Sequence, residues 1–345
     1  MRVLVTGHNG YIGSVMVPEL QAAGHEVIGL DTFFFEDCTL GHDGDIVPAI
    51  RKDIRDIQVV DLQGLDAVVH LAALCNDPLG DLHAEWTHEI NHRASIHLAL
   101  LARDAGVSRF LYASSCSMYG AAGSDDMLTE NAPLRPLTAY ATSKVRTEED
   151  LTTLADASFS PVYMRNATAY GLSPRLRADV VLNNLVCWAH TTGRIRIMSD
   201  GTPWRPVVHV QDIARAFATA LVAPREAIHN QAFNVGATAE NYQVRELAEI
   251  VRGTVAGCTV EYAAGAGPDP RSYRVDFGKL TRTFPDLKPR WNASFGAKDL
   301  HAALQEAGTT LADFQGRKYI RLSQIKHLLD SNRLDPSLRW TRQAE

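Results

Sequence analysis

The chain has 345 residues, more than a usual single domain, so the sequence predicts one large domain or two. Hydrophobic residues make up 46% of it, the formal net charge is −6, and no block of lysines and arginines stands out. This composition argues against a surface for nucleic acid or for anionic membranes. Five scattered cysteines without a C-x-x-C pair, no apolar run of transmembrane length and no leader-like N-terminus predict a cytoplasmic protein.

The first predicted strand, around residues 3–5, runs directly into a turn with three glycines. Gly7 allows a tight turn, Gly10 lets the backbone approach a bound group, and Gly13 lets a helix over 13–23 pack against the sheet. Free N–H groups at the start of that helix favour an anion, and a pyrophosphate is the obvious one. Three glycines at this spacing also fit a turn with a purely structural role.

The second predicted strand, residues 26–31, ends in Asp31. An acidic side chain there accepts hydrogen bonds from an adenosine ribose and repels a 2′-phosphate. Because Thr32 and Phe33 follow with no arginine nearby, the sequence favours NAD over NADP. Asp53 fits a place near the adenine edge, although a solvated strand end explains it equally well.

Strands and helices alternate through the first half of the chain, which predicts an α/β fold with a doubly wound parallel sheet. A further strand is expected over residues 66–73, DAVVHLAA. Its last residues, Ala72 and Ala73, are small enough to let a cofactor lie across the strand ends.

A polar cluster follows the predicted buried strand in RFLYASSCSMYG, residues 109–120, and YATSK follows at 140–144. Tyr140 and Lys144 are four residues apart, so a helix projects both from one face. Lowering a phenol pKa from about 10 by about three units needs roughly 4 kcal/mol. Two nearby cations in a dry site, the Lys144 ammonium and a cationic nicotinamide, can supply it. Tyr140 could then accept a proton from a sugar hydroxyl, and Ser115 would hydrogen-bond the same oxygen.

Together these motifs resemble those of the extended short-chain dehydrogenases/reductases, the family of nucleotide-sugar epimerases and dehydratases. The matches follow the family's order over residues 1 to about 300. They are TGHNGYIG at 6–13, Asp31, HLAA at 70–73, Asn91, SSCSMYG at 114–120, YATSK at 140–144, RNATAYG at 165–171, WRPVVHVQDI at 204–213, FNVG at 233–236 and DPRSYRVD at 269–276.

The resemblance implies an NAD-binding Rossmann domain and a smaller C-terminal α/β domain for a nucleotide-diphosphate sugar, with a UDP-sugar favoured. It implies that Ser115, Tyr140 and Lys144 are catalytic. The residues it places at the cofactor are Gly7, Asn9, Gly10, Tyr11, Ile12, Gly13, Asp31, Asp53, Ile54, Leu71, Ala72, Ala73, Asn91, Tyr140 and Lys144. Those it places at the substrate are Ser115, Thr168, Arg177, Asn183, Asn184, Arg205 and Arg271, of which Arg205 and Arg271 would grip the diphosphate.

The two residues that follow the predicted catalytic serine limit which reactions of the family this chain can catalyse. The family's dehydratases carry an Asp-Glu pair where this chain has Cys116 and Ser117, and decarboxylases place Glu at the position of Ser117. Some 3,5-epimerases of the family use a cysteine near this place as an acid/base group, but their cysteine aligns with Ser117, so Cys116 is expected to be a small packing residue. An NAD-dependent 4-epimerase fits best, a 4-ketoreductase would use the same residues, and a silent NAD-binding sensor is the non-enzymatic alternative.

The segment TAYGLSPRLRADV, residues 168–180, is similar to one in UDP-glucuronate 4-epimerases, apart from the two added residues Leu172 and Ser173. That similarity implies that Thr168 and Arg177 hold a uronate carboxylate. Alternatively, the arginines of this segment lie at the surface or bind phosphate.

The NAD-binding domain is expected over 1–165 with 207–236, and the substrate domain over 166–206 with 237–345. The tail after residue 312 predicts an amphipathic helix with its basic residues, Arg321 among them, on the faces away from the apolar one. The resemblance also implies a homodimer through the helix after SSCSMYG and the YATSK helix. His88 and His92 are expected on a solvated helix face, with no metal bound.

Overall fold

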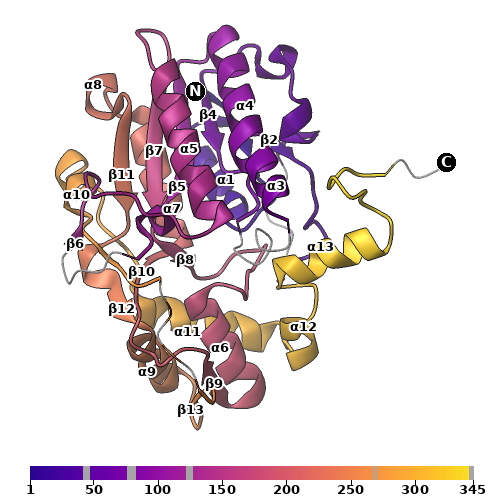
Figure 1. Cartoon of the computed structure of the whole chain (residues 1–345), viewed down its shortest axis with the longest axis vertical. Helices are drawn as coiled ribbons and strands as arrows, with labels where there is room; N and C mark the ends of the chain where they lie inside the picture. Colours follow the sequence, from indigo (N-terminus) through magenta and orange to yellow (C-terminus); the bar gives the residue numbers. More distant parts are fainter. Residues whose placement is uncertain are drawn as a thin grey trace.

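The computed structural model describes residues 1–41, 47–75, 83–121, 127–265, 267, 269 and 271–341. A central parallel sheet has the strand order β11-β7-β5-β4-β1-β2-β3 (Figure 1). Its strands are β1 Arg2–Thr6, β2 Glu26–Asp31, β3 Ala49–Arg51, β4 Ala67–His70, β5 Arg109–Ser115, β7 Ser160–Asn166 and β11 Gln231–Val235. The predicted doubly wound α/β fold is confirmed. Chain order reverses between β1 and β4, and in such sheets ligands bind in the crevice outside that point.

Helices cover both faces of this sheet because residues of its strands alternate between two apolar cores. Val3 and Val5 face the core that contains α1 (Gly13–Ala22) and α7 (Val210–Val222). Leu4 faces the opposite core, which contains α4 (Ala94–Asp104) and α5 (Ala139–Leu154). The shorter helices are α3 Ala84–Thr87, a π-helix at His88–Arg93, α8 Arg225–Ile228 and α10 Gly278–Thr283. Burial on both faces makes the sheet a rigid platform for the side chains at its carboxyl edge.

A smaller unit follows the central sheet and occupies the lower half of Figure 1. It contains a three-stranded sheet, β12-β10-β8, and a two-stranded sheet, β13-β9. A third core joins them to their helices. The elements are β8 Thr168–Tyr170, β10 Trp204–His209, β12 Asn241–Gln243, β9 Arg194–Ile197, β13 Thr259–Tyr262, α6 Val181–Thr192, α9 Val244–Thr254, α11 Ala293–Glu306 and α12 Leu311–Gln315. The pair β6 (Met127–Leu128) and β14 (Arg274–Val275) completes the strands.

The C-terminal segment, residues 316–341, returns to the central sheet. Its helix α13 (Arg321–Asp330) buries Ile325 and Leu328 in the core that holds Phe34 and Ile54. The amphipathic helix predicted for the tail therefore exists and docks on the body of the same chain. The predicted division into domains stays a prediction. Two elements pack differently from it: α13, assigned to the substrate domain, packs on the central sheet, and residues 207–209 of β10, assigned to the NAD-binding domain, belong to the three-stranded sheet.

One expectation about the helices is wrong. In the described residues no separate helix lies between SSCSMYG and the YATSK helix, which is α5. The helix that packs beside α5 on the sheet is α4, which precedes SSCSMYG in the chain (Figure 1). All five cysteines are free thiols. Across the described residues, no helix combines the length and the apolar character that crossing a membrane requires.

Candidate active site

A cavity of about 310 Å³ opens at the carboxyl ends of β1 and β4, where the sheet order reverses. Its lining combines most of the predicted cofactor residues with the predicted catalytic ones. The predicted residues in the lining are Gly7, Gly10, Tyr11, Ile12, Gly13, Asp31, Asp53, Ile54, Leu71, Ala72, Ala73, Ser115, Tyr140, Lys144, Thr168 and Arg177. The other lining residues include Thr32, Phe34, Phe35, Cys75, Ser117, Asn166, Val180 and Arg321.

The glycine turn is built as its sequence predicts. Gly7 has a φ of +72°, and a Cβ on it would lie 2.8 Å from the backbone nitrogen of Ala72. A Cβ on Gly13 would overlap the carbonyl oxygen of Gly7. The turn therefore brings β1, β4 and the first residue of α1 together, and the backbone at the start of α1 borders the cavity. That arrangement fits a dinucleotide with its pyrophosphate at the start of the helix.

Asp31 lies at the end of β2 and borders the cavity. Its carboxylate accepts the backbone N–H groups of Asn9 at 3.0 Å and Phe33 at 2.7 Å. Burial raises the pKa of Asp31, and these hydrogen bonds oppose the rise. Each carboxylate oxygen keeps a lone pair for a ribose hydroxyl, so the predicted role of Asp31 fits its surroundings.

The expectation that no arginine lies near Asp31 holds in sequence and is wrong in space. Pairing of β2 with β3 sets Arg51 opposite Asp31. The Arg51 guanidinium lies 4.1 Å from the centre of the Phe33 ring and pairs with Glu36. Glu36 thus pairs with the Arg51 guanidinium, which would otherwise be available to a 2′-phosphate. Asp53 also borders the cavity, with its carboxylate held by Arg55 at 2.7 Å.

Lys144 lies inside α5, one turn after Tyr140, and its side chain is buried. Its ammonium donates a hydrogen bond to the carbonyl oxygen of Ala113 at 2.6 Å. It lies 4.5 Å from the ring centre of Tyr112 and 5.6 Å from that of Tyr140. Burial lowers the pKa of Lys144 to about 8, so the ammonium is still charged at neutral pH. The predicted cation beside the phenol is therefore present in the fold.

Ser115 ends β5 and caps the short helix after it. Its hydroxyl accepts the backbone N–H of Ser117 at 3.1 Å and donates to the Ser117 hydroxyl at 2.9 Å. Between them Cys116 points the other way, buried, and donates its S–H to the carbonyl oxygen of Arg165 at 3.1 Å. Burial raises the pKa of the Cys116 thiol far above its usual range. Cys116 is thus the packing residue that the sequence predicts.

Asn91 supports the site from the π-helix and does not border the cavity. Its side-chain oxygen accepts the N–H of Leu74 at 2.7 Å, and its amide donates to the carbonyl of Leu74 at 3.0 Å. The backbone carbonyl of Asn91 also accepts the Thr147 hydroxyl of α5 at 3.1 Å. Asn91 therefore ties the loop after β4 to the helix of Tyr140, and its predicted contact with the cofactor stays a prediction.

Arg177 borders the cavity near Thr168 of β8. Its side chain donates to Asp179 at 2.8 Å and to the carbonyl oxygen of Cys75 at 3.0 Å. Although burial opposes its charge, Asp179 raises the pKa of Arg177. The surface alternative for Arg177 is therefore wrong, because this guanidinium is a fixed cation in the cavity wall.

The remaining substrate candidates lie outside the cavity lining. Arg205 and Arg271 come together on Asp269, each with a nitrogen 2.8 Å from the same carboxylate oxygen. Asn184 donates to the carbonyl oxygen of Ala178 at 2.9 Å. Arg205, Arg271 and Asn184 stay predictions as substrate contacts.

Asn183 is fully buried and serves the fold. Its oxygen accepts the N–H of Gly171, and its amide donates to the Tyr11 hydroxyl and to the carbonyl oxygen of Arg177. These contacts use both amide hydrogens, and Asn183 lies outside the cavity lining, so its contact with the substrate stays a prediction.

Sequence reasoning missed two buried groups at this site. Arg321 was expected on a face of the tail helix away from the apolar one, with no role at the site, yet it is buried and borders the cavity. Behind β5, Glu148 accepts three hydrogen bonds from guanidinium nitrogens of Arg165, at 3.0, 3.1 and 2.6 Å, and one from Ser114 at 2.5 Å. The i, i+4 spacing of Lys144 and Glu148 on one helix face was a usable signal for the second group.

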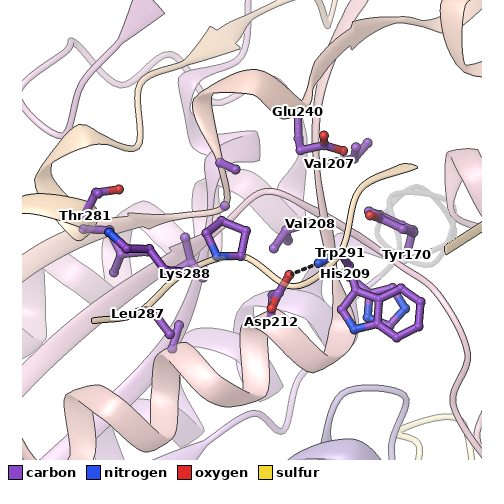
Figure 2. Close-up of a pocket in the computed structure, with 16 residues that line it drawn as sticks. Tyr170, Val207, Val208, His209, Asp212, Glu240, Thr281, Leu287, Lys288 and Trp291 are labelled. Atoms are coloured by element: carbon purple, nitrogen blue, oxygen red, sulfur yellow. Dashed lines mark hydrogen bonds between the residues drawn. The ribbon is translucent and has the colours of Figure 1, made fainter. Parts of the chain in front are cut away.

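A second, much smaller cavity of about 30 Å³ lies between β10, α7 and residues 287–291 (Figure 2). The His209 ring stacks on Trp291 with centroids 4.0 Å apart, and Asp212 accepts the backbone N–H of Trp291 at 3.1 Å. His209 also accepts the N–H of Gln211 and thereby caps α7. It is a buried core residue. This space is of water size, whereas the cavity at the sheet reversal is lined by the predicted cofactor and catalytic residues and is the candidate site.

Outside this region, the π-helix carries two histidines, and one of them contacts a carboxylate. His92 lies 2.6 Å from a carboxylate oxygen of Asp150. Within the described residues, no group of three His, Cys, Asp or Glu side chains is arranged to hold a metal ion.

Known proteins are similar to this chain in sequence and in fold. Residues 3–236 match the NAD dependent epimerase/dehydratase family. The chain is 31% identical over 297 residues to the UDP-glucose 4-epimerase of Mycolicibacterium smegmatis, covering 82% of this chain and 89% of that protein. It is also similar to the structure of MoeE5 in complex with UDP-glucuronic acid and NAD, with a TM-score of 0.76 and 28% identity over 89% of this chain and 100% of that one.

A third similar protein is the UDP-glucose 4-epimerase of Thermus thermophilus in complex with NAD. The TM-score is 0.74, with 25% identity over 88% of this chain and 99% of that one. The glycine turn, the cavity at the sheet reversal and these matches agree with one another. The chain belongs to the NAD dependent epimerase/dehydratase family and is an NAD-dependent enzyme.

Proposed function

We propose that this enzyme is a nucleotide-sugar 4-epimerase that acts on a UDP-hexose or a UDP-hexuronate through a transient 4-keto sugar. The observation that carries the proposal is the cavity lining, in which Ser115, Tyr140 and Lys144 share one space with the glycine turn. The residues after Ser115 supply no acid, because Cys116 is buried and Ser117 is a hydroxyl. A dehydratase of this family would need a carboxylic acid there.

The chemistry assigned to the side chains follows from their placement. NAD, which the glycine turn and Asp31 would hold, would supply the hydride acceptor and donor for C4 of the sugar. Tyr140 takes the proton of the C4 hydroxyl and later gives it back, with Ser115 hydrogen-bonded to the same oxygen. Lys144 supplies a fixed positive charge one helical turn from the phenol, which favours the phenolate.

Arg177 supports a uronate as one of the possible substrates. Its guanidinium is a fixed cation in the cavity wall, and a planar guanidinium binds a carboxylate through two parallel hydrogen bonds. Holding the carboxylate in place disfavours its loss from a β-keto acid. Thr168, on the same wall, offers a hydroxyl to the same group.

The test is incubation of the purified enzyme with UDP-glucose, UDP-glucuronate or a TDP-sugar, without added NADH, followed by chromatography of the sugar nucleotides. Formation of the C4 epimer without net change in NADH absorbance supports the proposal. Consumption of NADH with a 4-keto sugar, and no epimer, would replace it with a ketoreductase. Bound NAD with no turnover on any of these sugars would favour a sensor.

We also propose that the enzyme works in the cytoplasm and that two copies pair, as the family resemblance implies. We place the pairing at the YATSK helix α5 and at its neighbour α4, in place of the helix expected after SSCSMYG. Support comes from the position of these helices side by side on one face of the sheet (Figure 1). Light scattering coupled to size exclusion tests the dimer. A mass of a single chain at micromolar concentration would contradict it.

A further inference from the structure

Arg321 is the first residue of α13, in the segment that follows the smaller unit. Only 4% of its surface is exposed, and it borders the same cavity as the glycine turn. A cation that is buried this deeply normally has a carboxylate partner. We therefore looked for the group that balances the charge of Arg321.

The contacts of Arg321 satisfy one side of its guanidinium. Its Nη2 donates to the backbone carbonyl oxygen of Arg175 at 2.7 Å, and the group lies 4.4 Å from the ring centre of Phe35. Nη1 is buried and has no hydrogen-bond acceptor among the residues that the structure describes. A buried donor without an acceptor is costly, so a ligand that supplies one is favoured.

The neighbouring charges make an anionic ligand more favourable still. The positive charges of Arg177 and Arg175 act on Arg321, and Asp179 is paired with Arg177. Burial, together with these cations, lowers the pKa of Arg321 to about 10. Burial and the two neighbouring guanidiniums both disfavour the charge of Arg321, and an anionic ligand would offset them.

Two contacts place Arg321 on the cofactor side of the cavity. Arg175, whose carbonyl accepts from Arg321, donates from Nε to the side chain of Asn9 in the glycine turn at 2.9 Å. Phe35, against which the guanidinium packs, lies in the loop after β2, close behind the predicted ribose acceptor Asp31. Arg321 therefore sits between the glycine turn and the adenosine end.

We propose that Arg321 binds the pyrophosphate of NAD through its Nη1 group, opposite the backbone N–H groups at the start of α1. A guanidinium suits this task because its planar donors match phosphate oxygens. The inference rests on NAD as the cofactor and does not depend on the epimerase reaction, the sugar or the nucleotide of the substrate.

The segment that carries Arg321 is anchored to the adenosine end of the same cavity. Gln324 donates to the carbonyl of Phe34 at 2.9 Å, and Trp340 donates to that of Thr32 at 2.6 Å. Arg55, which also holds Asp53, donates to the carbonyl of Ser337 at 2.8 Å. These contacts fix α13 on the loop after β2, so the Arg321 guanidinium is held in place before the cofactor binds.

The test compares Arg321→Met with Lys326→Met in the full chain. Lys326 is an exposed cation on the same helix and serves as the matched control. Dissociation constants for NAD, ADP and adenosine are measured by calorimetry on the cofactor-free protein, and that for UDP on the NAD-saturated protein. For Arg321→Met we expect NAD and ADP to bind about 10- to 100-fold more weakly. Adenosine and UDP should bind as in the wild type, and Lys326→Met should change none of the four constants.

Each other result overturns the proposal. Unchanged NAD and ADP binding would leave the guanidinium with a structural role. Weaker UDP binding with unchanged NAD binding would assign it to the diphosphate of the sugar nucleotide. Equal losses for adenosine and ADP would indicate a disturbed adenosine pocket. If Arg321→Met does not fold, Arg321→Lys is measured in the same series, where loss of the planar donors should weaken ADP binding and spare adenosine.

Discussion

The ammonium of Lys144 lies 5.6 Å from the centre of the Tyr140 ring, with both side chains on one face of α5. A hydrogen bond to the carbonyl oxygen of Ala113 holds this ammonium in place. Because the group is buried, its charge acts on the phenol through a medium of low polarity, where it is screened less than in water. The proposed base and the cation that would favour its phenolate therefore lie one helical turn apart.

Replacing Tyr140 by Phe should reduce kcat by at least about 100-fold, because positioned proton transfer contributes a factor of this size or more. The cofactor should stay bound, since the substitution removes one hydroxyl. Turnover of the UDP-sugar and the NAD content of the purified protein are measured together. Tyr262→Phe, at an exposed tyrosine, is the control and should behave as the wild type. Activity of Tyr140→Phe near the wild-type level would remove this residue from the proposed mechanism.

The buried ammonium of Lys144 should also shape the pH dependence of stability. Its pKa in the folded protein is about 8, below the ordinary value of 10.5, so between these values the unfolded chain binds more protons. The free energy of unfolding should therefore gain up to about 3 kcal/mol from this group as pH rises from 8 to 10.5, and nothing below pH 8.

Urea unfolding of the cofactor-free wild type and of Lys144→Met over this pH range isolates that contribution. The difference in unfolding free energy between the two proteins should change with pH only above pH 8. Lys326→Met, at the exposed lysine on α13, should show no such change. A difference that stays constant up to pH 10.5 would mean that Lys144 keeps an ordinary pKa.

Local spacing made one part of the site predictable from the sequence. The three glycines follow a predicted strand and open a predicted helix, where they indicate a tight turn, and Tyr140 and Lys144 are four positions apart, on one face of any helix. Asp31 ends a strand whose apolar run is visible in the sequence. Each of these features depends on neighbours in the chain, so backbone geometry alone positions it.

Features that depend on distant segments were not predictable in this way. Arg51 reaches Phe33 because β3 pairs with β2, and no local pattern sets that register. Arg321 reaches the cavity because α13 docks on the loop after β2, although its own helix reads as an ordinary amphipathic one. The hydrogen bonds of Asn183 likewise join segments that are far apart in sequence. Their partners become known only with the tertiary structure.

Substituting Gly13 by Ala should destabilise the protein and release NAD. The added Cβ would overlap the carbonyl oxygen of Gly7 and lie 2.6 Å from the Cα of His8, so the turn must open. We expect a loss of about 1–3 kcal/mol in unfolding free energy. Gly253→Ala in α9 is the control, because nothing lies within 4 Å of its added Cβ. It should leave stability equal or raise it by up to about 1 kcal/mol. Similar thermal midpoints and NAD contents for both variants would contradict this account of the turn.

The buried pair of Glu148 and Arg165 should be essential for stability. Replacing Glu148 by Ala leaves the Arg165 guanidinium buried without its carboxylate, which costs about 3–5 kcal/mol. Glu149, the next residue of α5, is exposed, and Glu149→Ala should stay within about 0.5 kcal/mol of the wild type. Urea unfolding at neutral pH measures both variants. A loss below about 1 kcal/mol for Glu148→Ala would show that solvent reaches Arg165 when its partner is removed.

Arg177 should decide how well the enzyme uses a uronate. Replacing it by Ala removes a fixed cation from the cavity wall, and a charge-assisted pair with a carboxylate is worth about 1.5–3 kcal/mol. We therefore expect kcat/KM for UDP-glucuronate to fall about 10- to 100-fold further than kcat/KM for UDP-glucose. Arg194→Ala, at an exposed arginine, should change neither value. Equal losses on the two sugars would mean that Arg177 holds the cavity together through Asp179 and Cys75 and makes no distinction between the sugars.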